Sequence, residues 1–287
     1  MRGSMNTIGR NIRFTDFGES HGVAVGGVID GFPSRFVIDE EAIRKDLDRR
    51  SGRGCAGVSA RAQNEEDKVE WLSGVMDGVT LGSPIAYIIR NTDARSEDYE
   101  ALKDVYREGH ADWVYEQKYG IRDYRGGGRA SARETVARVV AGSLVKQLLA
   151  KQGISIKAEL VQVGEETDKT TFEALLSAVQ AAGESVGGVV ECRIKGMPAG
   201  VGEPIFDKLQ ARLAYAIMSI NGCRSFEYEG GIVGGISDGK DIVFRCRFKP
   251  TATKVKDYSG RHDACIAVRG AVVVEAMCAL TVADLMV

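Results

Sequence analysis

The chain has 287 residues, of which 44% are hydrophobic and 27% are charged, and its formal net charge is −2. This composition is typical of a soluble globular protein and offers no general attraction to nucleic acid or to an anionic membrane. No apolar run reaches the roughly 18–20 residues that span a bilayer. The six cysteines include no C-x-x-C pair, which argues against a zinc site or disulfide framework and favours reduced thiols in the cytosol.

The first half of the chain predicts short strands followed by helices. Residues 1–5 resemble an expression leader before a native Met5. The elements that follow are expected to be β-like runs over 6–35, a helix over 38–50, a Gly/Arg/Ser loop over 51–66, a turn and buried strand over 79–90, an irregular segment over 91–129 and a long helix over 131–150.

The second half predicts a loose variation on the first. Strands are expected over 154–163, 187–194 and 230–248, and helices over 169–183, 204–220 and 272–286. No linker rich in Pro or Ser separates the halves, so we expect residues 6–287 to form one α/β (α+β) domain. Its two pseudo-equivalent halves, about 6–150 and 151–287, would pack helices over sheets.

All three histidines lie in glycine-rich, charged stretches at 18–22, 109–112 and 260–263. Glycine permits tight turns and close ligand approach, and histidine exchanges protons near neutral pH. The sequence therefore predicts an enzyme whose active site is assembled from distant segments.

Residues 126–135 (GGGRASARET) run from a glycine loop into the long helix and allow two interpretations. Ser131 and Glu134 have the spacing of a capping box. Alternatively, the helix start is an anion site to which Arg129 and Arg133 add charge. No Lys-Ser/Thr follows the glycines, so the segment is not a nucleoside-triphosphate P-loop.

A second basic cluster surrounds the loop at 51–66 and contains Arg49, Arg50, Arg53 and Arg61. It is either a solvated face or a pocket that binds a carboxylate or phosphate group. In the second case Arg107 could belong to the same pocket.

Two other function classes remain open at this point. The stretch at 18–22 matches the Gly-x-Ser-x-Gly elbow of serine hydrolases, with Ser20 as nucleophile and His262 as base, although a β-like run follows it where an elbow requires a helix. A non-catalytic nucleotide-binding module would use the glycine loops but would leave three loop histidines without a role.

Taken together, these stretches resemble the chorismate synthase family. The matching segments run in order almost from end to end: FGESHG (17–22), DRR (48–50), NTD (91–93), DY (98–99), REGHAD (107–112), YEQKYG (115–120), RDYRGGGR (122–129), PAG (198–200), GEP (202–204), MSIN (218–221), GGIVGGI (230–236), KPT (249–251) and GRHD (260–263).

The resemblance implies a β-α-β sandwich of two related halves, with helices packed over antiparallel-rich sheets, usually assembled as a homotetramer. The implied activity is a cytoplasmic lyase of the shikimate pathway and aromatic amino acid biosynthesis. It would convert 5-enolpyruvylshikimate 3-phosphate to chorismate and phosphate by 1,4-anti elimination. The implied cofactor is reduced FMN, with NADPH acting only indirectly through an external flavin reductase. A catalytically inactive flavin-binding or nucleotide-binding homologue is the alternative.

The resemblance also assigns residues. His21 would donate a proton to the leaving phosphate, His110 would act at the flavin pyrimidine edge, and Asp263 would work with flavin N5 in taking the C6 hydrogen. The implied cofactor contacts are Ser131, Ala132, Asn221, Gly222, Gly235, Lys249, Pro250, Thr251, Ala252, Thr253 and Arg261, and the implied substrate contacts are Arg50, Arg107, Arg133, Ser20 and Arg49. No metal is implied.

The chain departs from the family in length. Material is absent after about Val163, after about Glu229 and after about Tyr258, and Ala264 stands where proline is usual. The resemblance also leads us to expect a second arginine in the loop at 51–66, and either Arg53 or Arg61 would serve as that arginine. Either the protein has lost these loops or the sequence as given omits them, and an intact mass of 31.0 kDa would establish the loss.

Overall fold

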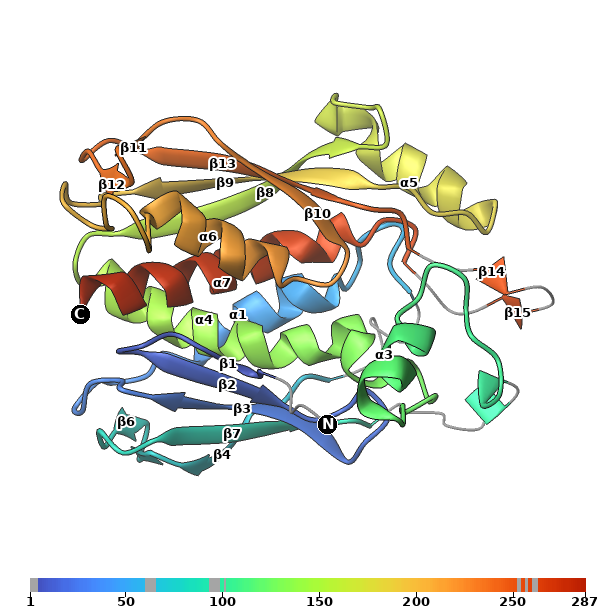
Figure 1. The fold of residues 1–287 in the computed structure, drawn as a ribbon, viewed down its shortest axis with the longest axis horizontal. Helices are drawn as coiled ribbons and strands as arrows, with labels where there is room; N and C mark the ends of the chain where they lie inside the picture. The colour runs from blue at the N-terminus through green and yellow to red at the C-terminus, as the bar shows by residue number, and fades with distance from the viewer. Residues whose placement is uncertain are drawn as a thin grey trace.

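Two antiparallel sheets enclose a layer of helices in the computed structural model (Figure 1). The structure describes residues 5–59, 66–92, 99–100, 102–251, 254–255, 258–259 and 263–287, with backbone alone at 254–255 and 258–259. The first sheet has the strand order β1-β2-β3-β7-β4 and the second has the order β10-β13-β9-β8. This arrangement confirms the expected β-α-β sandwich with antiparallel-rich sheets.

The strands of the first sheet are β1 (Thr7–Ile8), β2 (Arg13–Phe17), β3 (Ala24–Asp30), β4 (Glu70–Ser73) and β7 (Ile85–Arg90), and those of the second are β8 (Ser155–Val163), β9 (Gly188–Lys195), β10 (Cys223–Tyr228) and β13 (Ile242–Phe248). Three small hairpins pair β5 (Val75–Met76) with β6 (Val79–Thr80), β11 (Ile232–Val233) with β12 (Ile236–Ser237), and β14 (Lys254–Val255) with β15 (Tyr258–Ser259). The helices are α1 (Glu40–Ser51), α3 (Asp112–Tyr119), α4 (Thr135–Ala150), α5 (Phe172–Ala181), α6 (Leu209–Met218) and α7 (Ala267–Met286), with 3-10 turns η2 (Gly128–Ala130), η3 (Ala132–Glu134) and η4 (Lys169–Thr171).

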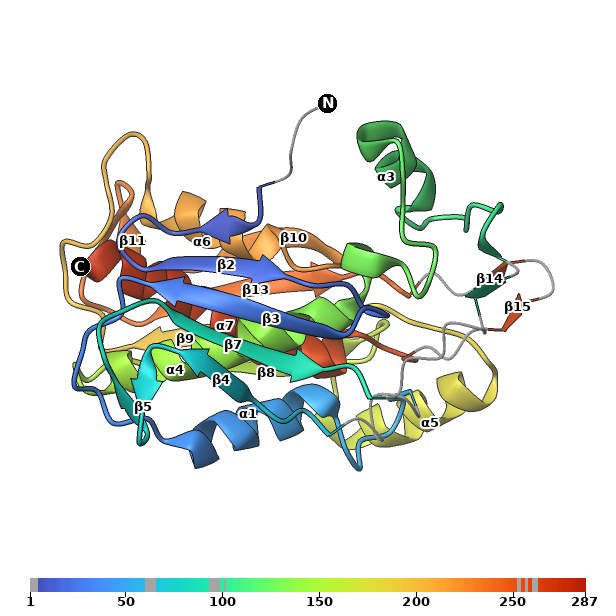
Figure 2. The same ribbon diagram turned by 90° about the horizontal axis from the view of Figure 1, so that it is seen from below.

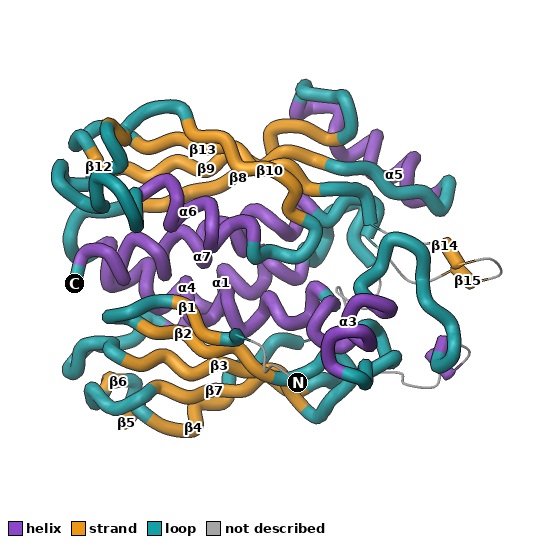
Figure 3. Tube along the Cα trace, in the orientation of Figure 1, coloured by secondary structure: helices purple, strands orange, loops and turns teal. Residues whose placement is uncertain are grey.

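The central helices are buried because their sequences are apolar on nearly every side. Helices α4 and α7 pack against each other between the sheets (Figure 3), and α7 is buried from Gly270 to Asp284. Gly142 of α4 is needed for this contact, because a Cβ there would lie 2.2 Å from the Cα of Ala276.

The last turn of α7 also binds the start of the chain. Asp284 Oδ1 accepts hydrogen bonds from the backbone N–H groups of Arg10, Asn11 and Ile12, at 2.7, 2.7 and 3.1 Å. Asp284 Oδ2 pairs with Arg212 of α6 at 2.8 Å. One carboxylate therefore joins β1–β2, α6 and α7.

Most predicted elements are confirmed, including the helix over 38–50, whose N-cap Asp39 accepts from the N–H of Ala42. Several differ. Helix α3 lies inside the segment predicted to be irregular and projects from the body (Figure 2). Strands β4, β5 and β10 have no predicted counterpart, the helix expected over 204–220 begins only at Leu209, and the helix expected over 272–286 begins earlier, at Ala267. Within the described ranges, no helix combines the length and apolarity required to cross a bilayer.

Candidate active site

The glycine loop at 126–128 brings two of the predicted catalytic histidines together. Gly126 has φ +61°, and a Cβ there would lie 2.1 Å from His21 Cε1. A Cβ on Gly127 would lie 2.7 Å from His110 Cε1 and 3.2 Å from Arg107 Nη2. Only glycine allows both rings to approach so closely, so this loop forms the floor between them.

His21 lies in the turn between β2 and β3, where its side chain is buried. Its Nδ1 is 3.0 Å from Ser20 Oγ, and its ring meets the Tyr99 ring edge-on with centroids 4.8 Å apart. Asn91 Nδ2 closes the turn by donating to the carbonyls of Glu19 and Gly22, at 3.0 and 2.9 Å. The turn joins two strands, so the strand-to-helix elbow of a serine hydrolase is not formed around Ser20.

His110 is oriented by Asp112 at the start of α3. His110 Nδ1 lies 2.9 Å from Asp112 Oδ1, and Arg107 donates through Nε and Nη2 to the same carboxylate at 2.8 and 2.9 Å. Burial raises the pKa of Asp112, but hydrogen bonds from Arg107 and His110 outweigh it and hold the pKa well below its usual range. Asp112 therefore stays charged and suits a His110 tautomer whose Nδ1 carries the proton and whose Nε2 can accept one.

Arg50 and Arg133 form a buried pair around Asp67. Arg50 Nη1 lies 3.0 Å from Asp67 Oδ2, and Arg133 Nη1 donates to Asp67 Oδ1. Arg133 also donates through Nε to Asn91 Oδ1 at 2.8 Å, which links the pair to the turn that carries His21. Burial by itself raises the pKa of Asp67, but the positive charges of Arg50 and Arg133 together lower it by more. The net pKa is below its ordinary value, so the carboxylate stays ionised.

Arg49 is placed differently from its neighbour. Its side chain is partly exposed, and its guanidinium makes two 2.8 Å hydrogen bonds to Glu275 of α7 and a 3.1 Å bond to Asp46. The structure therefore uses Arg49 to join α1 to α7 and does not bring it to the histidines.

Several predicted cofactor residues converge beside the histidines from distant segments. Asn221 Nδ2 donates to the Ser131 carbonyl at 3.4 Å, and the backbone N–H of Lys249 donates to Gly222 O at 2.9 Å. Lys249 Nζ reaches Gly109 O, next to His110, at 3.1 Å.

Asp263 lies next to this group. Thr251 Oγ1 donates to the Asp263 carbonyl at 3.2 Å, which places Pro250 and Thr251 between Lys249 and Asp263. The Asp263 carboxylate is fully engaged, by the Ser59 N–H at 2.8 Å and by Arg269 at 2.9 Å. Arg269 in turn donates to the carbonyl of Arg50 at 2.8 Å, and Ala132 O accepts from Arg50 at 3.0 Å.

Not every predicted residue joins this group. Gly235 lies between β11 and β12, which Figure 1 shows at the opposite end of the molecule from α3. Ala252, Thr253, Arg261 and His262 lie outside the described residues, as does Arg61. In the described part of the chain, no three His, Cys, Asp or Glu side chains are grouped to hold a metal ion.

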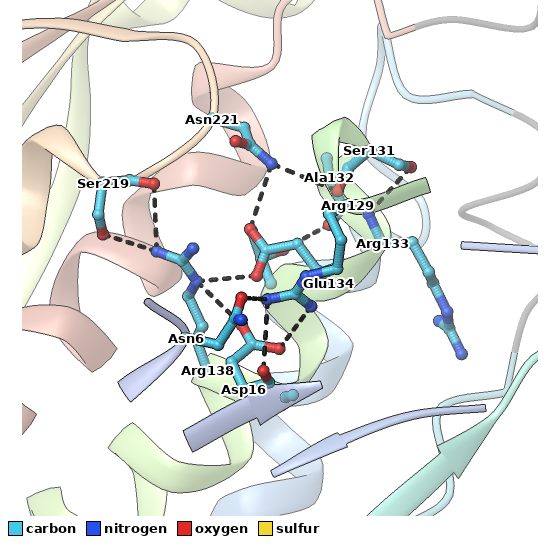
Figure 4. Close-up of polar contacts among 12 residues, drawn as sticks. Asn6, Asp16, Arg129, Ser131, Ala132, Arg133, Glu134, Arg138, Ser219 and Asn221 are labelled. Carbon is cyan, nitrogen blue, oxygen red and sulfur yellow. Dashed lines mark hydrogen bonds and ion pairs between the residues drawn. The ribbon is translucent and has the colours of Figure 1, made fainter. Parts of the chain in front are cut away.

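The capping box is not formed at the start of α4. Ser131 Oγ accepts from the Arg133 N–H at 3.3 Å, but the Glu134 carboxylate points away from Ser131. It binds Arg138 Nε at 2.8 Å and Asn221 Nδ2 at 3.2 Å, as Figure 4 shows. Glu134 therefore belongs to a buried polar cluster and not to a helix cap.

This polar cluster faces a cleft of about 1280 Å³. The cleft is lined by residues of β1, α3 and α6 and by Gly127 and Gly128 of the glycine loop, and neither His21 nor His110 lines it. Of the predicted site residues that fall in the described ranges, only Asn221 lines it. Its wall includes the four members of the polar cluster, Asp16, Arg129, Glu134 and Arg138, together with other charged residues: Glu19, Lys118, Arg122, Asp123 and Arg125.

Sequence reasoning gave no role to Asp67, Asp112, Asp16 or Arg138. Asp112 stands two residues after His110, a spacing that offered a signal. The other three carry no local pattern, because their partners are distant in the chain.

The chain is similar to known proteins over nearly its whole length. The family model described as chorismate synthase matches residues 12–229 and 227–287. The chorismate synthase of Christiangramia forsetii is 41% identical over 345 aligned positions, which cover 97% of this chain and 96% of that protein. The chorismate synthase of Bacteroides thetaiotaomicron is 41% identical over 348 positions, covering 97% of each. A crystal structure of chorismate synthase is 28% identical, with a TM-score of 0.77, and covers 97% of this chain and 92% of that one.

The alignments also bear on the predicted gaps. The first relative aligns over 345 positions against 287 residues here, so at least 58 of its positions (345 − 287) have no counterpart in this chain. The two segments of the family match meet at 227–229, beside the predicted gap after Glu229.

Proposed function

The chain belongs to the chorismate synthase family, and we propose that it is a lyase that converts 5-enolpyruvylshikimate 3-phosphate to chorismate and phosphate by 1,4-anti elimination with reduced FMN. We further propose that it acts in the cytoplasm as a homotetramer in aromatic amino acid biosynthesis. An external flavin reductase would supply the reduced cofactor from NADPH.

The observation that carries the proposal is the meeting of His21 and His110 on one glycine loop. They are 89 positions apart in the chain (110 − 21), and each has a fixed partner: Ser20 for His21, and Asp112 for His110. Two oriented imidazoles on either side of a bare backbone floor suit a reaction that moves protons at two points of one small substrate.

The arginines support recognition of the substrate, which carries a phosphate and two carboxylates. Arg50 and Arg133 lie beside the turn of His21, and Arg107 lies beside His110. A planar guanidinium binds such anions through two parallel hydrogen bonds. All three are already engaged by Asp67 or Asp112, so they would share their donors with the substrate.

The chemistry of the surrounding side chains fits FMN. Lys249 supplies a positive charge next to His110 and suits the cofactor phosphate, and Asn221, with a donor and an acceptor, lies against Ser131. Bound flavin would lend electron density as phosphate departs and accept it back as hydrogen is removed. Ser131, Gly222, Pro250 and Thr251 would line the same place.

In this proposal the protein holds and moves protons. His21 would protonate the departing phosphate, and His110, with Nδ1 held by Asp112, would present Nε2 to the flavin pyrimidine edge. Asp263, kept in place by Ser59 and Arg269, would act at the side where the C6 hydrogen leaves.

The test is anaerobic turnover of 5-enolpyruvylshikimate 3-phosphate with photoreduced FMN, followed by chorismate absorbance and phosphate release. We expect turnover that requires reduced flavin and is lost in His21→Ala. Turnover that persists without flavin, or none in a protein that binds FMN, would refute the lyase proposal, the latter in favour of an inactive homologue. The intact mass of the same sample decides whether 31.0 kDa is the whole chain.

A further inference from the structure

Two buried carboxyl groups meet behind the turn that carries Asn221. Asp16 of β2 and Glu134 at the start of α4 are 6% and 2% exposed. Both converge on Arg138, whose Nε lies 2.8 Å from Glu134 Oε2 and 3.4 Å from Asp16 Oδ2 (Figure 4). Arg129 Nη1 holds the other oxygen, Asp16 Oδ1, at 2.9 Å.

The hydrogen bonds around these two carboxyl groups are one donor short, and a single proton shared between the groups would supply it. Nε of Arg138 carries a single hydrogen and points it at Glu134. Asp16 Oδ2 is then buried with no hydrogen-bond partner in the described part of the chain. Leaving a buried acceptor unpaired is costly, and two close carboxylates cannot both ionise cheaply. A proton on Glu134, donated to Asp16 Oδ2, satisfies both groups.

The charges around Glu134 agree with this protonation. It is faced by Arg138 of its own helix, Asp16 of β2, Arg129 of η2 and Tyr115 of α3. Burial raises the pKa of Glu134, Arg138 opposes the rise, and Asp16 adds to it. With one proton the two arginines outweigh the single remaining carboxylate, so the cluster keeps a net charge of +1 beside the cleft.

Glu134 also reaches the predicted flavin contact directly. Its Oε1 accepts a hydrogen bond from Asn221 Nδ2 at 3.2 Å. Its partner Arg138 binds both Oγ and the carbonyl of Ser219, at 2.8 and 3.3 Å. The acid pair thus anchors the Ser219–Asn221 turn at two points, and it fixes which end of the Asn221 amide faces outward.

We propose that Glu134 is a positioning residue for the cofactor site. In its protonated form it shares a proton with Asp16, orients the Asn221 side chain and, through Arg138, holds the 219–221 turn ready for an anionic flavin. This inference rests on the proposed use of FMN but adds residues to which the resemblance gave no role.

The test is a double-mutant cycle on FMN binding, read by quenching of flavin fluorescence at about pH 7. Glu134→Ala removes the hydrogen bond to Asn221 and should raise the Kd about tenfold. Glu134→Gln keeps an acceptor for Asn221 and offers Asp16 an N–H in place of the shared proton, so it should bind nearly as well as the wild type. In the Asn221→Ala background, Glu134→Ala should add much less than it costs alone, because the route through Asn221 is already lost and only the route through Arg138 and Ser219 remains.

Three results would overturn the inference: folded Glu134→Ala that binds FMN like the wild type, Glu134→Gln as weak as Glu134→Ala, or additive losses in the double variant. Above about pH 8, wild-type affinity should fall while that of Glu134→Gln stays constant, a difference that a merely structural role would not produce.

The same cycle read by thermal unfolding without flavin separates the two claims. Coupling between Glu134 and Asn221 in unfolding supports the positioning role even if the wild type binds no FMN, a result that would refute only the proposed cofactor. Absence of coupling there overturns the positioning role itself.

Discussion

Replacing Gly126 by alanine should misplace His21. The new Cβ would stand 2.1 Å from His21 Cε1, whereas ordinary contact begins at 3.4 Å, so the ring must retreat by about 1.3 Å (3.4 − 2.1). His21 is buried and contacts Ser20 and Tyr99, so a displaced ring must disturb these contacts. A misplacement of about 1 Å costs roughly 10²-fold in rate, and alanine at φ +61° adds about 1–2 kcal/mol of strain.

Gly120 provides a matched control. It has φ +75° at the end of α3, and a Cβ there meets nothing within 4 Å, so Gly120→Ala carries the backbone strain without the collision. We expect both variants to lose stability in thermal unfolding, Gly126→Ala more because the collision adds to the strain, but only Gly126→Ala to lose anaerobic turnover in its folded form. Wild-type turnover in Gly126→Ala, or an equal loss in Gly120→Ala, would refute the reasoning.

Three further outcomes follow from the buried charges. Asp67→Asn should lower the unfolding free energy by about 3–5 kcal/mol, because it leaves two buried arginines without their carboxylate; denaturant titration showing a loss below about 1 kcal/mol would contradict this. Asp112→Asn should lower kcat about 10²-fold by releasing His110, and unchanged kcat in steady-state assays would show that the dyad does not matter. The pKa of Glu134 is raised to about 8 from 4.5, so between these values the native state holds a proton that the unfolded chain has lost, and stability falls as pH rises. The stability of Glu134→Gln relative to the wild type should therefore grow across that window by up to about 1.4 kcal/mol per pH unit, and a constant difference in denaturant titrations would refute the shared proton.

The layers of the fold were predictable because most elements carry local signals. The helix at 40–51 has an N-cap residue and an asymmetric distribution of charge. The helices at 135–150 and 267–286 have mostly apolar sequences, which predict that they are buried. Helix α3 was missed because its apolar residues Trp113 and Val114 are exposed and only Asp112 is buried, so no amphipathic period marks it. The helix expected from Pro204 begins at Leu209 because Ile205 and Phe206 project outward and are not packed.

The site was predictable only where a motif carried it. His21, His110, Asn221, Lys249 and Asp263 came from long distinctive stretches, and contacts in the structure link the segments that carry them, while their roles stay predictions. The spacing of Ser131 and Glu134 was misleading, because Glu134 gains more from Arg138 and Asn221 than from a helix cap. Asp16 and Asp67 are defined only by partners far along the chain, and a sequence pattern cannot register such pairings.

Asp284 has a consequence for how the protein is made. The backbone N–H groups of residues 10–12 donate to a carboxylate that lies more than 270 residues later in the chain, so these hydrogen bonds cannot form until that residue has been synthesised. A ribosome that adds about 5–20 residues per second needs tens of seconds to supply it. Until α7 emerges, the inner face of the second sheet also lacks the helix that covers it. During that interval the nascent chain exposes apolar surface and backbone donors without their final partners. Because such surface promotes aggregation, we expect chaperones to bind the chain during translation.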